Sequence, residues 1–507
     1  MQTNTRYGII DIGSNSVRLV IYEQLEGNAY RVIDESKQSE RLSSKVEKDG
    51  SIPLSSLVGL IDTLNYFQMV CDVHNVSHIR AVATAAIRNA INSDEIILYL
   101  NKQTGVHIEV LSGQMEAYLG FVGVMNAMNI QDGYVVDIGG GSTEVSLFVG
   151  RELLHSISFP FGAVNMAKQY CKDGEISTSN LALLRKHVEQ QLTKTTWLKS
   201  KSNLPVIGLG GSFRSLAKIN QRGKQYSLPL THQYEMTIPE VEVIIEQFLT
   251  TPFEKRKRIN GLAKDRADII VPGVIILQTI LKHVRATQLV ISGSGLRDGV
   301  YQHTRNPNQP INPDVVGQSV MNLLANHTAI NVNHVLHVNQ LAMNLFGALR
   351  HQSSIFDNKD ATYLSTAAQL YRIGISIDYY SYQKHTFYLI AFSRLFGLNH
   401  REKLMCALIA SFKSKGQMMQ LASPYKDILS ADDLSKCVLL GSLLQLAIAL
   451  DRSETQPIAN ITCTVTKKDL TITAEIKHAV TIEQRELSAI SQEFNKAWTL
   501  RPTLTIL

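Results

Sequence analysis

The sequence contains no paired cysteines, and this absence limits what kind of protein it encodes. Its 507 residues include five scattered cysteines without a Cys-X-X-Cys pair: Cys71, Cys171, Cys406, Cys437 and Cys463. An odd number of isolated cysteines does not make a disulfide framework, and structural zinc sites usually need cysteine pairs. We therefore expect free thiols, a reducing compartment and no structural zinc.

A long apolar run and a secretion signal are also missing. The most apolar stretches, Ile269–Leu281 and Val438–Leu450, are shorter than a membrane span and contain polar residues, so we expect them to be buried helices. The first residues, Met-Gln-Thr-Asn-Thr-Arg, lead directly into a predicted strand and lack a signal-peptide layout. These features predict a cytoplasmic protein that does not contact a membrane.

Neither sign of charge is in strong excess. The chain has 50 Lys and Arg residues against 44 Asp and Glu residues, a formal net charge of +6, and 44% hydrophobic residues, as in ordinary globular proteins. This mild excess permits a polyanionic ligand without indicating one, and no basic tail predicts a nucleic-acid partner. The length predicts several domains with cores of their own.

What the sequence does contain is a glycine-rich turn between two apolar segments, within Gly133–Phe148. Backbone N–H groups of such a turn can approach an anion closely, because glycine has no Cβ in the way. Asp137 and Glu144 flank the turn and are well placed for a hydrated Mg²⁺ beside a phosphate. The candidate phosphate-binding residues here are Gly140, Gly141, Ser142 and Thr143.

A second hairpin, at Tyr7–Ile21, repeats the pattern of an apolar strand, Asp-Ile-Gly, small hydroxyl residues and another apolar strand. The repeat predicts an internal duplication. The alternative for one such turn alone is an ordinary hairpin, but two that face each other across a cleft would clamp a phosphate chain from both sides. The candidate phosphate-binding residues of this copy are Gly13, Ser14, Asn15 and Ser16, with Asp11 as a further candidate metal ligand.

Glu116 is the best candidate for chemistry. Ile108–Leu111 is predicted to be a strand, Ser112 can cap a helix, and Met115–Met128 has helical periodicity, so Glu116 is expected in the first turn of a helix that begins at the cleft. A carboxylate there can take a proton from an attacking water. The alternative is an acid that only favours the helix N-terminus.

These segments together resemble the exopolyphosphatase / guanosine pentaphosphate phosphohydrolase (Ppx/GppA) family of the actin-like ATPase and sugar kinase superfamily. The matching segments, in family order, are Asp11–Ser16, Ala83–Ala90, Leu111–Ala117, Asp137–Glu144, Gly208–Ser212 and Ser294–Gly299. The resemblance implies an α/β fold with two actin-like (ribonuclease H-like) lobes around a cleft, a helical HD-like domain and a small α+β C-terminal unit. The expected boundaries are 1–125, 126–305, 306–455 and 456–507, with the Pro- and Asn-rich Asn306–Pro313 as a linker.

The resemblance also implies roles for individual residues. Glu116 would be the catalytic base, and Arg88 would contact phosphate. A glycine turn at Gly210, Gly211 and Ser212 would border distal phosphates. Mg²⁺, held by Asp137, Glu144 and Asp11, is the implied cofactor, with a monovalent cation such as K⁺ as a further candidate. Met115 departs from the family, whose members often carry a second glutamate at that position.

The helical region departs further from the resemblance. Domains related to metal-dependent HD phosphohydrolases need a His-Asp pair, and this chain has Tyr371 and Arg372 where that pair should fall. His334, His337 and His385 are therefore expected to be core or surface residues, and no catalytic metal is expected in this domain. Phe253–Arg258 is a charge run that favours a solvated helix face, with a polyanion-guiding role as the alternative.

The function implied is processive hydrolysis of the terminal phosphoanhydride of inorganic polyphosphate by a homodimer. Explicit phosphate loops without a recognisable guanine feature favour polyphosphate over the alternative substrate, guanosine pentaphosphate (pppGpp). A kinase of the sugar-kinase type and a non-catalytic sensor of a phosphate-rich ligand remain as hypotheses from other classes.

Overall fold

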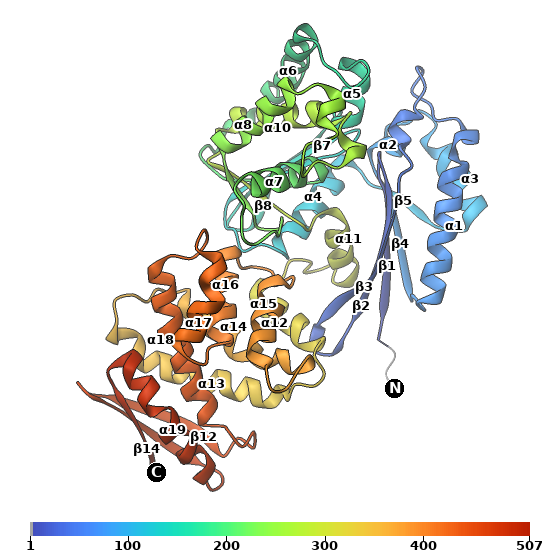
Figure 1. The fold of residues 1–507 in the computed structure, drawn as a ribbon. Helices are drawn as coiled ribbons and strands as arrows, with labels where there is room; N and C mark the ends of the chain where they lie inside the picture. Colours follow the sequence, from blue (N-terminus) through green and yellow to red (C-terminus); the bar gives the residue numbers. More distant parts are fainter. Residues whose placement is uncertain (1–3) are drawn as a thin grey trace. The chain divides into compact units, whose positions relative to one another are not determined.

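Two sheets that share a five-strand pattern form the framework of the first part of the chain (Figure 1). The strands β8-β7-β6-β9-β11 of the second sheet correspond to β3-β2-β1-β4-β5 of the first, and β10 is added at the edge. The computed structural model describes residues 4–507, in two compact units that divide between Val315 and Val316. The first sheet has the order β3-β2-β1-β4-β5, and the second has the order β10-β11-β9-β6-β7-β8. β1 pairs antiparallel with β2 and parallel with β4, as β6 does with β7 and β9. The predicted duplication therefore extends over a whole five-strand pattern.

The strands of these sheets are β1 (Arg6–Ile12), β2 (Val17–Gln24), β3 (Tyr30–Gln38), β4 (His78–Ala83), β5 (Ile108–Val110), β6 (Gly133–Ile138), β7 (Thr143–Val149), β8 (Glu152–Phe159), β9 (Val206–Leu209), β10 (Glu235–Thr237) and β11 (Gln288–Ile291). The helices of the same unit are α1 (Val58–Val73), α2 (Ala85–Arg88), α3 (Ser93–Thr104), α4 (Gly113–Met125), α5 (Ala163–Tyr170), α6 (Thr178–Thr193), α7 (Gly211–Gly223), α8 (Ile238–Thr250), α9 (Phe253–Arg256), α10 (Ile270–Val284) and α11 (Leu296–Arg305).

The central strand β1 is buried on both faces of the first sheet, and its alternating side chains enter two different cores. Ile10 and Ile12 belong to the core formed with α1 and α3, and Ile9 belongs to a second core with Val300 and Tyr301 of α11. Figure 1 shows α1 and α3 along one side of this sheet. This two-sided burial explains the nearly continuous apolar run of the strand.

Helices α4 and α11 contact each other through their backbones. A Cβ on Gly299 would lie 1.7 Å from the carbonyl oxygen of Leu119, and a Cβ on Gly123 would lie 2.1 Å from that of Gly295. Helix α4 precedes the expected lobe boundary at residue 125, yet it packs against β6, β7 and β8 of the second sheet, and α11 also packs against β1. The chain therefore crosses between the lobes at this helix pair.

The second unit, Val316–Leu507, is helical with a small terminal sheet. Its sheet has the order β12-β13-β14, and α19 packs against β14, as befits the expected α+β unit. No helix among the described residues 4–507 is long and apolar enough to cross a membrane. The elements of this part are α12 (Val315–Ala325), α13 (Val332–Leu349), α14 (Asp360–Leu370), α15 (Tyr382–Phe392), α16 (His400–Ala410), α17 (Lys415–Ala422), α18 (Ala431–Ala449), β12 (Ile458–Val465), β13 (Asp469–Ile476), α19 (Thr481–Trp498) and β14 (Arg501–Ile506).

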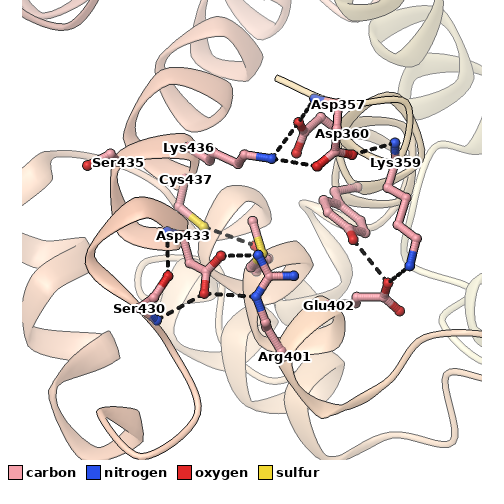
Figure 2. Close-up of polar contacts among 12 residues, drawn as sticks. Asp357, Lys359, Asp360, Arg401, Glu402, Ser430, Asp433, Ser435, Lys436 and Cys437 are labelled. Carbon is pink, nitrogen blue, oxygen red and sulfur yellow. Dashed lines mark hydrogen bonds and ion pairs between the residues drawn. The ribbon is translucent and has the colours of Figure 1, made fainter. Parts of the chain in front are cut away.

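A network of ion pairs connects the helices of this unit (Figure 2). The Nζ of Lys436 lies 2.8 Å from Oδ2 of Asp357 and 2.9 Å from Oδ2 of Asp360, whose side chain is inaccessible to solvent. Arg401 binds the equally buried Asp433. Because an unpaired buried charge is costly, Asp360 and Asp433 depend on their cations.

The charge run Phe253–Arg258 is only partly a solvated face. Lys255 and Arg258 are exposed, but Arg256 is 1% exposed. Its guanidinium donates to the carbonyl oxygens of Gly174 at 2.9 Å and Ala267 at 3.2 Å. The expectation of a solvated face is therefore wrong for Arg256, which ties three chain segments together.

A methyl group at Gly299 tests the contact between α4 and α11. Gly299→Ala forces the two backbones apart, and we expect it to lower the free energy of unfolding of the first unit by about 1–3 kcal/mol. The urea midpoint should be followed by Trp197 fluorescence in a Trp498→Phe background. Gly223→Ala is the matched control, because no atom lies within 4 Å of its Cβ position. Equal midpoints for the two variants would show that the contact is not tight.

Removal of the Lys436 charge tests the buried network. Lys436→Ala leaves Asp360 buried without its cation, and we expect a loss of about 3–5 kcal/mol in the second unit, followed by Trp498 fluorescence in a Trp197→Phe background. Lys496→Ala breaks an exposed pair with Glu493 and should cost less than about 0.5 kcal/mol. A similarly small effect at Lys436 would contradict its role in stability.

Candidate active site

The two glycine-rich hairpins form the same turn twice. The N–H of Gly13 donates to the carbonyl oxygen of Ser16 at 3.2 Å, and the N–H of Gly139 donates to that of Ser142 at 2.9 Å. The two turns lie against each other, since a Cβ on Gly140 would be 3.0 Å from the Cβ of Ser14. The predicted pair of facing loops is therefore present.

A cavity of about 180 Å³, called the cleft below, opens beside these turns. It lies where β1, β6 and β9 end and where α4, α7 and α11 begin. The predicted site residues that line it are Asp11, Gly13, Ser14, Asn15, Ser16, Glu116, Asp137, Gly140, Ser142, Gly210 and Gly211. Residues from four separate chain segments thus meet at one place.

The other predicted residues lie just behind this lining. The hydroxyl of Thr143 donates to the carbonyl oxygen of Phe161 at 2.7 Å, and Ser212 is fully buried beside Gly273 of α10. A Cβ on Gly141 would lie 3.0 Å from the Oγ of Ser14. The phosphate-binding roles of Gly141, Thr143 and Ser212 stay predictions.

Glu116 occupies the place expected from the sequence. The Oγ of Ser112 accepts the N–H of Met115 at 3.1 Å and caps α4, so Glu116 lies in the first helical turn and reaches the cleft. Nη1 of Arg88 donates to Oε2 of Glu116 at 2.5 Å and to the carbonyl oxygen of Leu111 at 3.1 Å. Arg88 therefore orients Glu116 directly.

Glu144 lies on the other side of Arg88. Nη2 of Arg88 is 3.9 Å from Oε1 of Glu144, which accepts the hydroxyl of Ser158 at 2.7 Å. Neither Arg88 nor Glu144 is among the residues that line the cleft. The structure thus joins two glutamates through one arginine, an arrangement that the separate sequence motifs did not indicate.

The acids around the cleft are held in an environment that disfavours their charge. Burial raises the pKa of Glu116 to about 7, although Arg88 lowers it in part. Burial and then the neighbouring Asp11 raise the pKa of Asp137 to about 6, and burial raises that of Glu144 well above its usual value. A carboxylate with a pKa near 7 is well suited to exchange protons at neutral pH.

Four arginines that sequence reasoning missed also line the cleft: Arg18, Arg214, Arg266 and Arg297. Burial lowers the pKa of Arg18 and of Arg214, and each is lowered further by neighbouring arginines. A Cβ on Gly211 would lie 2.1 Å from the guanidinium carbon of Arg266. Such crowding of like charges favours a multiply charged anion between them.

A signal for some of these arginines is visible in the sequence. Arg18 and Arg214 each follow a predicted phosphate residue, Ser16 or Ser212, by two positions, and Arg297 lies in a family-like segment. Arg266 has no local signal, because it reaches the cleft from the segment before α10.

The carboxylates that line the cleft fit a Mg²⁺ site only in part. Within residues 4–507, no group of three or more His, Cys, Asp or Glu side chains gathers as a metal cage. Asp11 and Asp137 both line the cleft, however, and each lies at the end of its strand before a glycine turn. Mg²⁺ in phosphoryl-transfer sites is commonly held by one or two carboxylates together with substrate phosphates, which this pair fits.

Comparison with known proteins extends over both units. A family model described as the Ppx/GppA phosphatase family matches residues 20–305, and one described as Ppx/GppA phosphatase, domain III, matches residues 316–493. The chain is 27% identical over 299 residues to Exopolyphosphatase 1 of Mycobacterium tuberculosis, covering 58% of this chain and 87% of the relative. It is 25% identical over 505 residues to the guanosine-5'-triphosphate,3'-diphosphate pyrophosphatase of Vibrio cholerae, covering 97% of both chains.

Solved structures confirm the fold class. An exopolyphosphatase from Cytophaga hutchinsonii superposes with a TM-score of 0.55 at 25% identity, covering 61% of this chain and all of that one. The Ppx/GppA family member of Aquifex aeolicus superposes with a TM-score of 0.52 at 28% identity, covering 60% and 99%. The predicted actin-like α/β lobes, followed by a helical domain and a small C-terminal β unit, are thus confirmed. Because one family model alone matches more than half of its residues, the chain belongs to the Ppx/GppA phosphatase family.

Proposed function

We propose that the protein hydrolyses the terminal phosphoanhydride bond of inorganic polyphosphate and releases orthophosphate. The observation that supports this substrate is the lining of the cleft, in which two N–H-rich turns and four arginines lie beside three aspartates and Glu116. Among the described residues, no Phe, Tyr, Trp or His lines the cleft. Repeated phosphates need such charge and N–H donors, whereas a nucleobase is commonly stacked on an aromatic ring.

Glu116 is the general base in this proposal. Its carboxylate takes a proton from water as the water oxygen forms a bond to the terminal phosphorus and the bridging P–O bond breaks. Orthophosphate leaves, and the shortened chain departs as the anionic leaving group. Arg88 holds the Glu116 carboxylate in place and keeps part of it ionised at neutral pH.

The turns and arginines bind the phosphate chain. The backbone N–H groups of Gly13–Ser16 and of Gly140–Ser142 stabilise negative charge on the phosphoryl group that is transferred. Arg18, Arg214, Arg266 and Arg297 neutralise the phosphates that follow it. Because these contacts are to phosphate alone, the chain can advance by one phosphate after each cleavage, which accounts for a processive reaction.

Asp11 and Asp137 would hold Mg²⁺, with Glu144 as a further candidate that lies behind the cleft lining. When bound, this ion neutralises charge on the phosphate oxygens. The raised pKa of Asp137 fits this role, because a cation removes the repulsion between buried carboxylates.

The second candidate function is 5'-phosphohydrolysis of pppGpp. It is favoured by the similarity over nearly the full chain to the Vibrio cholerae protein, whose name describes a guanosine nucleotide substrate. Both reactions cleave a terminal phosphoanhydride with the same groups, and they differ in what must be bound beyond the phosphates.

Glu116→Gln tests the base. The amide keeps the shape of the side chain but cannot accept the proton, so we expect kcat for phosphate release from long-chain polyphosphate to fall by about 100- to 10,000-fold with little change in KM. Glu109→Gln is the control, because Glu109 pairs with Arg80 outside the cleft. Full activity of Glu116→Gln would exclude this residue as the base, and tight binding of polyphosphate without release by the native protein would favour a sensor.

The pH profile tests the link between Arg88 and Glu116. Only ionised Glu116 can act as a base, so kcat/KM of the native protein should fall about tenfold per pH unit below a pKa of about 7. Arg88→Gln removes the charge that lowers this pKa, so its acidic limb should move to higher pH. Arg80→Gln, which removes an arginine outside the cleft, should leave the limb in place. An unmoved limb in Arg88→Gln would contradict the assignment.

A further inference from the structure

Arg266 reaches the cleft on a short segment, Ala263–Asp268, which we call the strap. The strap precedes α10 and contains a single 3₁₀ turn, Lys264–Arg266. Nε of Arg266 is buried, and it has no hydrogen-bond partner among residues 4–507. A guanidinium donor without a partner binds an anion without first breaking another contact. What holds the strap therefore decides where this arginine lies.

One side of the strap is anchored within its own lobe. The buried side chain of Arg256 donates from Nη1 to the carbonyl oxygen of Ala267 at 3.2 Å. The two aspartates of the strap, Asp265 and Asp268, contact the other lobe instead. Asp265 immediately precedes Arg266, and Asp268 follows it by two positions. Contacts made by both aspartates therefore hold the chain on either side of the arginine.

Two cations of the first lobe face these aspartates. Nη1 of Arg41 lies 3.7 Å from Oδ2 of Asp268, and Nη2 of Arg41 donates to the carbonyl oxygen of Asp265 at 3.5 Å. Nζ of Lys37 lies 4.0 Å from Oδ2 of Asp265. Because these contacts are long and the side chains are partly exposed, each contributes little to the stability of the fold. They are suited instead to a link between the lobes that opens and closes.

Arg41 is also bound to the first glycine turn, through its backbone. The N–H of Arg41 donates to the carbonyl oxygen of Asn15 at 3.0 Å, and the N–H of Ser43 donates to that of Ser14 at 3.0 Å. The backbone of Arg41 is left-handed, with φ of 44°, which is costly for a residue with a Cβ. Such a conformation persists only where surrounding contacts maintain it, as these two hydrogen bonds do. One residue thus contacts the glycine turn with its backbone and the strap with its side chain.

We propose that Arg41 is a positioning residue that couples the first glycine turn to Arg266, so that both bind the same phosphate chain together. This inference rests on the proposed function, because it concerns how the cleft holds the phosphates of its substrate. When Arg41 is paired with the strap, Arg266 is held against the chain that the glycine turn binds. The link biases Arg266 by no more than its own strength, so it contributes about two- to fivefold to affinity.

The dissociation constant (Kd) of labelled long-chain polyphosphate tests the coupling. All variants carry Glu116→Gln, so that the chain is not consumed, and are compared at one ionic strength. Asp268→Asn removes a negative charge near the cleft, and simple attraction would then tighten binding of a polyanion. The loss of the link should instead weaken binding about two- to fivefold. Glu246→Gln, which removes an exposed acid of α8 outside the cleft, should not weaken it.

Double variants separate positioning from direct binding. Arg266→Ala should raise Kd about tenfold or more, since it removes hydrogen bonds to a charged group. Adding Arg41→Ala to Arg266→Ala should raise Kd no further, because Arg41 acts through Arg266. Adding Arg41→Ala to Arg297→Ala should multiply the two effects, because Arg297 is held by Glu35 at 2.9 Å instead. The urea midpoint of each variant verifies that it is folded.

Three results would overturn the proposal. They are tighter or unchanged binding in Asp268→Asn, unchanged binding in Arg41→Ala, and multiplied effects of Arg41→Ala and Arg266→Ala, which would show that Arg41 binds phosphate itself. Failure of the native protein to release phosphate from a chain that it binds refutes the proposed function alone, because the coupling is measured by binding. If polyphosphate does not bind, the same variants are compared with pppGpp, so that the two failures stay distinct.

Discussion

The backbone contact between α4 and α11 is the constraint on which the candidate active site depends. Glycines 123 and 299 let two helices approach more closely than any side chain would allow. One end of α4 then packs on the second sheet while its first turn carries Glu116 to the cleft. Since α11 also contacts β1, the helix pair fixes Glu116 relative to both glycine turns. The duplicated sheets supply the two glycine turns, and this contact places a carboxylate beside them in the cleft.

Charge in the first unit is concentrated rather than excessive. A net charge of +6 over 507 residues is modest, yet four arginines meet in a cleft of about 180 Å³. Buried acids with raised pKa values lie beside them, and the protein pairs only some of these charges with each other, as in Glu116 with Arg88 and Arg297 with Glu35. A phosphate chain with its counter-cation complements both sets of groups. Net charge therefore says little about a ligand that binds in one small volume.

Sequence analysis predicted the features that depend on residues close together in the chain. These are the two hairpins, the Ser112 cap and the position of Glu116 in its helix, and each is as expected. Sequence analysis could not predict which side chains from distant chain segments would meet in the fold. Arg266 reaches the cleft without a local motif, and Asp451 pairs with a histidine 117 positions away. The exposed position predicted for Arg256 was wrong, because nothing in a run of charged residues shows which side chain packs inward.

The account is tested most directly by competition between its two candidate substrates. Long-chain polyphosphate and pppGpp should be supplied to the native protein together, with Mg²⁺, and phosphate release from each followed in the same reaction. An arginine-lined cleft without an aromatic surface predicts a higher kcat/KM for polyphosphate. A higher kcat/KM for pppGpp would contradict the polyphosphate assignment. It would show that the guanine ring is recognised by groups outside this cleft lining.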